Sequence, residues 1–469
     1  MASRRMFLKS AGMAAAALSL SRTNYIAAQA NKQSAAEAPF ISKQKEKTNI
    51  ILILADDLGQ ECLSCYGNTA YQTPNLDQMA AQGVQFTDCH ATPLCTPSRV
   101  KIMTGQYNFR NYVEFGVLRK GEKTFAHLFK AYGYATCCAG KWQLNARKEG
   151  QTPSEAGFDE HCLWQVNIAG ERYHTPTFTR NGEPVREMQG QYGPDVESDF
   201  ICDFMERKKD QPFFVYYPMC LPHAPFEPTP DSPEWPEKMG MQDARFYKDM
   251  ALYMDKLVGK IVQKTETLEI ADKTLILFTA DNGSPTGITT ATRKGLVRGG
   301  KGTTSDAGTR VPLIAFWKNH SGFGDLCTDL IDFTDVLPTL ADAAGIPIPA
   351  DWTVDGNSFL PQIYSLHNPR WKSQIFVYFD PRIRQPWSMQ KWVRGKRFKL
   401  YDDGRFYDIQ TDVREEYPLK QEALSPWVCR LRDEYQKILN HYKDVRAPYL
   451  HPDGIKRLRE KTLNSKENK

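Results

Sequence analysis

Acidic and amide side chains stand in adjacent pairs at two distant positions of this 469-residue chain. The pairs are Asp56 with Asp57 and Asp281 with Asn282, and each follows an apolar run. One acidic residue after a strand is usually a turn former or a helix cap, but two such pairs are harder to explain in that way. Carboxylate and amide oxygens favour Ca²⁺ or Mg²⁺ over Zn²⁺. The four residues therefore predict a site for a hard divalent cation.

Buried strands must position these residues. The two pairs follow the apolar runs 49–55 and 274–280, and Lys141 follows a third run at 133–139. Continuous apolar runs of this length are typical of central strands buried on both faces. In open α/β sheets, ligands bind beyond the carboxyl ends of the strands. We therefore expect Lys141 and both pairs to lie at one edge of such a sheet.

The alternation of apolar runs with helical stretches predicts an α/β fold with a large, mixed but mostly parallel sheet and helices on both faces. Further strands are expected at 133–138, 213–217 and 311–316, with helices at 75–82, 197–208, 246–264 and 335–344. Past residue 370 the pattern predicts a small antiparallel sheet from strands at 375–379, 391–394, 398–401 and 405–408, followed by a helix at 426–441.

The amino terminus resembles a twin-arginine signal peptide over residues 1–30. Arg4 and Arg5 precede the apolar run 11–20, and Ala28 to Ala30 offers a small-residue cleavage site. A run of roughly 10 residues is too short for a membrane span, which needs about 20, and no later segment is apolar enough. We expect removal of this segment, export of the folded chain to the periplasm or beyond, and no membrane span afterwards.

Beyond the signal we expect a linker at 31–47, a main α/β domain at 48–370 and a C-terminal α+β subdomain at 371–469. The first 30 residues hold four of the 60 basic residues and none of the 55 acidic ones, so the remainder is almost neutral. Such a balance argues against a nucleic-acid partner. The eleven cysteines are an odd number, so in an exported chain at least one is free or chemically special.

One cysteine opens a motif that other blocks of the chain support. Cys95-Thr-Pro-Ser-Arg99 is followed by Thr104-Gly105. The other blocks are Asp56-Asp57, Gly133 to Trp142, Pro222-His223-Ala-Pro225, Asp281-Asn282-Gly283, and Gly299 to Thr304 leading to Arg310-Val-Pro312. With these blocks in order over about residues 47–420, the chain resembles the formylglycine-dependent sulfatases, arylsulfatase-like members of the alkaline phosphatase superfamily.

The resemblance implies that a maturation enzyme oxidises Cys95 to formylglycine (3-oxoalanine). The hydrated aldehyde would attack sulfur and later expel sulfate by re-forming the aldehyde. The family also implies Ca²⁺, held by the modified Cys95 and by the two pairs, Asp56 with Asp57 and Asp281 with Asn282. Oxygen ligands of this kind distinguish the site from two-zinc phosphatases of similar fold, which need histidine ligands.

The resemblance further assigns Arg99, Lys141 and Lys301 to the sulfate group and His223 to protonation of the leaving alcohol. Gln143 departs from the family pattern, in which a histidine follows Gly-Lys-Trp and assists the loss of sulfate. Glutamine can donate and accept hydrogen bonds, yet it cannot exchange a proton near neutral pH. Two spare histidines, His90 and His127, are candidates for that role, although His127 stands on a helical stretch.

Specificity in this family is carried by variable loops. The expected substrate-binding residues are Gln143, Lys141, Lys301, His174 and Arg298, with Arg180 in the loop 167–192 and Arg382, Arg384 and Trp387 in the loop 378–392. Polar and aromatic loops in an exported enzyme favour a sulfated sugar or polysaccharide as substrate. Two alternatives stay open, a phosphate or phosphonate monoester hydrolase with the same site, and a non-catalytic binder of sulfated glycans.

Overall fold

A computed structural model describes residues 47–185, 190–366, 368, 371–381 and 389–448. The expected signal peptide, nearly all of the linker and the loop residues Arg382, Arg384 and Trp387 lie outside these ranges. Residues 48–469 group into one compact unit, separate from residues 1–47. Within the described part of the chain, no helix combines the length and the apolar character needed to cross a membrane.

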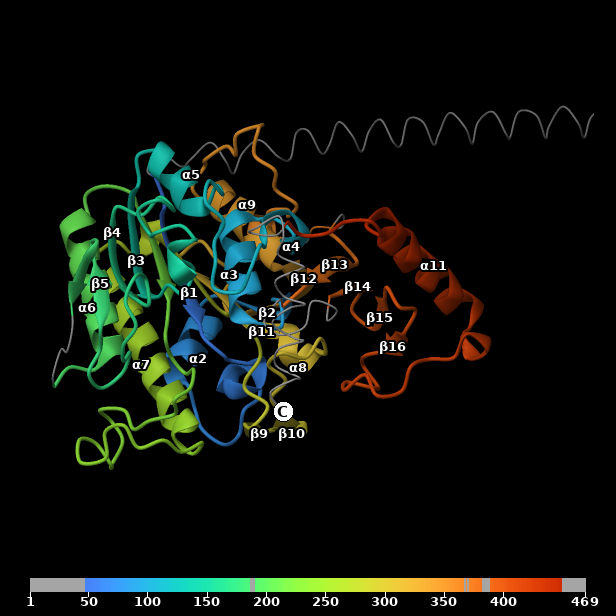
Figure 1. Ribbon diagram of the computed structural model, residues 1–469, viewed down its shortest axis with the longest axis horizontal. Helices are drawn as coiled ribbons and strands as arrows, with labels where there is room; N and C mark the ends of the chain where they lie inside the picture. Colours follow the sequence, from blue (N-terminus) through green and yellow to red (C-terminus); the bar gives the residue numbers. More distant parts are fainter. Residues whose placement is uncertain (1–46, 186–189, 367, 369–370, 382–388, 449–469) are drawn as a thin grey trace, which may run out of the picture. The chain divides into compact units, whose positions relative to one another are not determined.

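A ten-stranded mixed sheet forms the centre of this unit (Figure 1). In spatial order its strands are β12 (Asp325–Asp332), β2 (Val84–His90), β11 (Arg310–Trp317), β8 (Thr274–Ala280), β1 (Asn49–Ala55), β7 (Phe213–Pro218), β3 (Ala135–Lys141), β4 (Glu160–Trp164), β5 (Phe178–Arg180) and β6 (Glu183–Val185). Strands β8, β1, β7, β3 and β4 run parallel, and all seven residues of β1 are buried. The large, mixed α/β sheet predicted from the apolar runs is thereby confirmed.

Helices cover both faces of this sheet (Figure 1). One layer contains α2 (Pro74–Ala81), α6 (Gly193–Lys208) and α7 (Phe246–Thr267), and the other contains α3 (Cys95–Thr104), α5 (Phe125–Ala131) and α9 (Val336–Ala343). This part also contains three short helices, α4 (Asn108–Asn111), α8 (Asp306–Thr309) and α10 (Leu360–Ile363). A two-stranded ribbon of β9 (Thr289–Thr292) and β10 (Gly295–Arg298) completes it. Both α5 and α6 contact β3, so the central strands are shielded from water on either side.

The second sheet is small and antiparallel, as predicted. It consists of β13 (Ile375–Phe379), β14 (Gln390–Arg394), β15 (Phe398–Tyr401) and β16 (Phe406–Asp408), and α11 (Pro426–His441) packs on β14 and β15. Side chains of β13 alternate between two hydrophobic clusters, with Phe376 and Tyr378 in the cluster that includes α11 residues and Val377 in the other. This alternation with period two is what a strand between two apolar layers requires.

Several predicted boundaries were wrong by a few residues, each for a local reason. Helix α6 begins at Gly193 instead of residue 197, because Pro194 fits the first helical turn, where no backbone N–H is needed. Strand β3 begins at Ala135 instead of 133, because Gly133 is left-handed with φ of 78°. The strand then continues through Lys141, which brings that lysine to its carboxyl end.

Candidate active site

The two acidic pairs meet at the carboxyl edge of the sheet. Ala55 of β1 pairs with Ala280 of β8, so the residues that follow these strands are neighbours. The backbone N–H of Asp57 donates to Asp281 Oδ1 at 3.2 Å, and Asn282 Nδ2 donates to Asp57 Oδ1 at 2.7 Å. Asp57 has a left-handed backbone with φ of 67°, a conformation that is uncommon outside glycine. Register and turn geometry therefore join residues about 225 positions apart.

Each carboxylate of this cluster contacts a cation. Lys141 Nζ lies 2.7 Å from Asp56 Oδ2, and both side chains are buried. Lys301 Nζ lies 2.5 Å from Asp57 Oδ2, and Arg99 Nε lies 3.0 Å from Asp281 Oδ2. Three carboxyl groups and three cationic side chains are thus paired in a site that is largely closed to water, where such interactions are strong.

The surroundings separate the acidities of these carboxyl groups. Burial raises the pKa of Asp56, but Lys141 and the other nearby cations outweigh burial and hold it well below its usual value. For Asp281 burial is the larger effect, and together with the charge of Asp56 it raises the pKa to about 7 although Arg99 opposes the shift. Of these two carboxyl groups, Asp56 is therefore the one that stays ionised at neutral pH.

Cys95 is the first residue of α3, and every residue of that helix is buried. Its Sγ lies 3.9 Å from Gln143 Oε1, so the two residues are in contact. Burial raises the pKa of the Cys95 thiol, although Lys141 opposes the shift. An unmodified Cys95 would therefore remain a protonated thiol, whereas the positive end of the α3 dipole favours an anionic group at this position.

The residues after Cys95 hold α3 in place. Ser98 Oγ accepts a hydrogen bond from the backbone N–H of Thr92 at 2.9 Å, which fixes the loop before the helix. Arg99 Nη1 donates to the backbone oxygen of Lys141 at 2.8 Å, and Lys101 forms a buried ion pair with Asp332 at 2.5 Å. Ser98 and Lys101 therefore have structural partners, whereas Arg99 connects α3 to both β3 and the acidic cluster.

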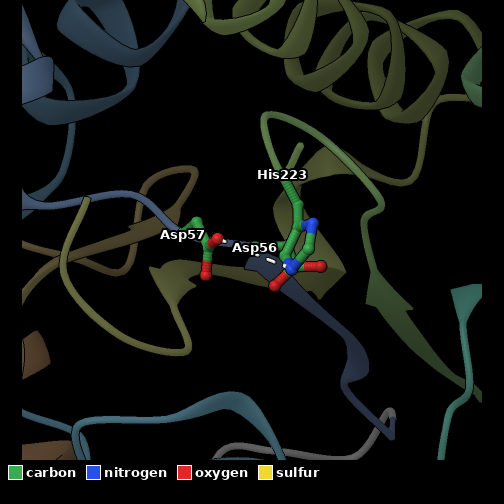
Figure 2. A group of neighbouring side chains, drawn as sticks. All are labelled: Asp56, Asp57 and His223. Atoms are coloured by element: carbon green, nitrogen blue, oxygen red, sulfur yellow. Dashed lines mark ion pairs between the residues drawn. The ribbon is translucent and has the colours of Figure 1, made fainter. Parts of the chain in front are cut away.

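His223 stands beside the cluster, with its ring near Asp56 and Asp57 (Figure 2). Its Nε2 lies 3.2 Å from Lys301 Nζ and 3.6 Å from Asp57 Oδ2. Burial lowers the pKa of His223 to about 4, since Lys141 and Arg172 add to the effect of burial and the neighbouring carboxylates only partly oppose it. The ring is accordingly neutral at pH 7 in this environment.

The cluster fits a hard cation. Within the described ranges, Asp56 Oδ1 and Asn282 Oδ1 are buried without a hydrogen-bond partner. A buried oxygen without a partner is costly, and coordination of a divalent cation would satisfy both atoms. Asp56, Asp57 and His223 together form a candidate site for a divalent metal, in which oxygen donors outnumber the imidazole nitrogen.

Other predicted residues have partners outside the cluster. His174 Nδ1 lies 2.8 Å from Glu227 Oε2, and exposed Arg298 donates to the backbone oxygen of Thr286 at 2.8 Å. The Arg180 guanidinium lies 5.2 Å from the centre of the Phe200 ring.

The two spare histidines also have structural partners. His127 takes part in the capping box that begins α5, and buried His90 contacts the Arg394 guanidinium. In the described part of the chain, no hydrogen bond or ion pair joins either histidine to Cys95 or to the carboxylates.

Sequence reasoning missed Arg172. Its Nη2 lies 3.0 Å from His223 Nδ1 and also donates to the backbone oxygen of Ala224. The guanidinium carbon lies 4.4 Å from the centre of the Trp164 ring, and only 6% of the residue is exposed. A single arginine in a loop carries no sequence signal, because its contact with His223 depends on how two distant loops pack.

Comparisons with known proteins agree with this geometry. A family model described as Sulfatase matches residues 48–346. The chain is 34% identical over 390 residues to Arylsulfatase A from Homo sapiens, covering 75% of this chain and 74% of the relative. It is 30% identical over 351 residues to N-acetylgalactosamine-6-sulfatase from Homo sapiens, covering 67% of this chain and 65% of the relative.

Among solved structures, the fold resembles that of Ps i-CgsB with a TM-score of 0.70 and 24% identity, covering 87% of this chain and 96% of that chain. The family model spans the acidic pairs, the Cys95 motif, His223 and Lys301 in one continuous match. The match therefore covers every group that the structure gathers around the candidate metal site. The chain belongs to the sulfatase family and is a sulfuric ester hydrolase.

Proposed function

We propose that this sulfatase hydrolyses a sulfate ester of a sugar or polysaccharide. The bond between sulfur and the ester oxygen breaks, the oxygen of water is transferred to sulfur, and the alcohol leaves with a proton. The observation that carries the proposal is the set of three cations and three carboxylates beside Cys95. A carbohydrate substrate is supported by the similarity to N-acetylgalactosamine-6-sulfatase.

Positive side chains bind and orient the sulfate group in this proposal. Lys141 and Lys301 contribute ammonium groups, and Arg99 fixes Asp281 and the start of the Cys95 helix. Formylglycine derived from Cys95 supplies the nucleophilic oxygen for attack on sulfur. Asp56, Asp57, Asp281, Asn282 and the modified Cys95 would hold calcium, which would supply Lewis-acid polarisation of the sulfate.

His223 is the proposed proton donor to the leaving alcohol, and its neutral ring would take up that proton when the anionic sulfate ester binds beside it and raises the pKa of the ring. Its Nε2 faces Lys301 and Asp57, the side of the ring on which the substrate would lie. Gln143 orients the group at position 95 by a hydrogen bond, since its amide already lies 3.9 Å from Sγ. A neutral amide replaces a histidine here, so the proton that leaves during the loss of sulfate passes to water or to another group.

We also propose that the protein is exported by the twin-arginine pathway and acts in the periplasm or outside the cell. Residues 1–30 are the signal, 31–47 a linker, 48–370 the catalytic domain and 371–469 a C-terminal subdomain. Because twin-arginine export carries folded chains, a formylglycine-generating enzyme would act on Cys95 before export.

Peptide mass spectrometry combined with kinetics tests this function. Protein from a host that has a maturation enzyme is expected to contain the aldehyde at position 95 and to hydrolyse an aryl sulfate. Cys95→Ala should abolish turnover and keep the fold. Full activity with only unmodified cysteine would contradict the formylglycine nucleophile. Faster hydrolysis of the matched aryl phosphate would favour the phosphatase alternative, and binding of sulfated glycans without turnover would favour the binder.

A further inference from the structure

A cavity of about 490 Å³ adjoins the candidate active site. Its wall comes from three loops, at 115–116, 143–148 and 165–169. Gln143 belongs to this wall and also lies 3.9 Å from Cys95 Sγ, so the cavity borders the reacting position. Pockets for small ligands in proteins measure roughly 300–1,000 Å³, and this one has room for more than a sulfate group.

The three loops are tied to one another by backbone and side-chain hydrogen bonds. The Gln143 N–H donates to the Gln165 backbone oxygen at 3.3 Å, and the Ala146 N–H donates to the Gly116 oxygen at 2.9 Å. Asn145 Nδ2 donates to Asn167 Oδ1 at 3.0 Å. The cavity is therefore a preformed feature of the fold.

Backbone strain is concentrated in this wall. Ten described residues other than glycine have a positive φ, and four of them line the cavity. They are Gln143 at 48°, Arg147 at 56°, Lys148 at 63° and Gln165 at 59°. Left-handed backbone at such residues costs free energy and persists where the surrounding structure enforces it, as at binding sites.

Two acceptor atoms in the wall lack partners. Asn145 Oδ1 and Gln165 Oε1 are buried and, among described residues, accept no hydrogen bond. Protein atoms cover both oxygens in this structure, and rotation of either amide would bring its oxygen to a hydroxyl donor of a ligand in the cavity. The half-buried ring of Phe115 adds an apolar surface of the kind against which a sugar ring can pack.

The charges around the cavity compensate one another. Arg147 Nη2 lies 2.5 Å from Glu114 Oε1 and 3.3 Å from Glu149 Oε2. With Lys148 counted, two cations stand against two carboxylates, so the wall and its ion-pair partners carry no net formal charge. A second anionic group on the ligand is therefore not what this cavity selects.

We propose that the cavity binds the sugar ring of the substrate and that Asn145 and Gln165 are specificity-determining residues, which accept hydrogen bonds from its hydroxyl groups. This inference rests on the proposed sulfatase activity and names the part of the substrate that each amide recognises. A site built to pair with a hydroxyl group discriminates strongly against an analogue that lacks it, because its own polar groups then stay unpaired.

The test compares two substrates in one set of variants. Gln165→Met removes the acceptor at similar size, and Gln165→Glu keeps it. We expect Gln165→Met to lower kcat/KM for N-acetylgalactosamine 6-sulfate about tenfold more than kcat/KM for 4-nitrophenyl sulfate, because one hydrogen bond is lost with the sugar only. Gln165→Glu should preserve the ratio of the two values. Turnover of 4-nitrophenyl sulfate reports that each variant is folded and mature.

Monodeoxy analogues of the sulfated sugar provide an independent arm. In the parent enzyme, removal of one particular hydroxyl should lower kcat/KM about tenfold, and the same removal should have little effect in Gln165→Met. Equal losses of kcat/KM in the parent enzyme and in Gln165→Met would overturn the assignment of Gln165 to that hydroxyl. A more than tenfold preference for a disulfated over a monosulfated sugar would also overturn the proposed sugar site. Absence of aryl sulfate turnover in the mature parent enzyme would instead refute the proposed function.

Discussion

The buried pair of Lys141 and Asp56 allows a quantitative test of the charge arrangement. Its atoms lie 2.7 Å apart and both side chains are 0% exposed. At an effective dielectric constant of about 20, two unit charges at this distance attract by about 6 kcal/mol. Removal of one partner from a buried pair costs roughly 3–5 kcal/mol, because the other charge stays buried without compensation. Arg99 Nη2, 3.9 Å from Asp56 Oδ2, gives partial compensation and favours the lower value.

We therefore expect Lys141→Met to destabilise the metal-free protein by about 3 kcal/mol. The compact unit of residues 48–469 should unfold with an entropy of roughly 0.9 kcal/mol/K, so the melting temperature would fall by about 3 °C. The matched control is Lys256→Met, whose lysine lies 2.7 Å from Asp231 Oδ1 but is 54% exposed. Exposed pairs of this kind contribute about 0–1 kcal/mol, and the control should shift by no more than about 1 °C.

Calcium should recover part of this loss. A cation at 100 times its Kd stabilises the folded state by about 2.7 kcal/mol, or about 3 °C here. The calcium-induced shift should be larger in Lys141→Met than in the parent chain, because the lysine no longer competes for Asp56. Activity should stay more than about 10²-fold lower even with calcium, since the proposed mechanism then lacks the Lys141 ammonium group that orients the sulfate.

Differential scanning fluorimetry in chelator and in a calcium series measures the melting temperatures of Lys141→Met and Lys256→Met and the calcium-induced shift of each protein. Equal melting temperatures of Lys141→Met and Lys256→Met in chelator would refute the buried-pair argument. A calcium shift that is absent from both the parent chain and Lys141→Met would refute the metal site.

Three further predictions concern residues around the site. Gln143→Ala should lower kcat about 10²-fold with little change in KM, since an oriented amide beside Cys95 is lost. A change in KM alone, measured by steady-state kinetics, would contradict this role. Arg172→Met should lower kcat/KM for alkyl sulfates more than for aryl sulfates, because the substitution loosens His223 and only poor leaving groups need a proton from that ring. Equal losses of kcat/KM for both substrates would show a general structural effect. Burial raises the pKa of the fully buried Glu197 carboxyl to about 8. The free energy of unfolding therefore falls as pH rises from about 4.5 to 8, by up to about 5 kcal/mol in total. Glu197→Gln should remove that slope and raise the melting temperature at pH 8, whereas an unchanged pH dependence of melting would place the carboxyl in a wetter environment.

The amino-acid sequence alone determined the framework of this protein. Six apolar residues in a row after Asn49 predict the buried strand β1, whose bounds the structure reproduces, since a strand covered on both faces has no polar side. Helix α11 also begins and ends where expected, because Ser425 caps its first turn and Pro426 fits that turn. The acidic pairs could be placed at one sheet edge because the alternation of strands and helices predicts parallel strands, whose carboxyl ends lie at the same edge.

Only the tertiary structure decided which groups touch. It pairs Lys141 with Asp56 and Arg99 with Asp281, brings Arg172 to His223, and builds the cavity of Asn145 and Gln165 from three loops. These contacts join residues far apart in the chain, so no local pattern records them. The pKa of Asp281 has the same origin, because burial and the charge of Asp56 act on it only after β1 and β8 pair. Local preference and hydrophobic spacing act between neighbours in sequence, whereas the chemistry of this site depends on neighbours in space.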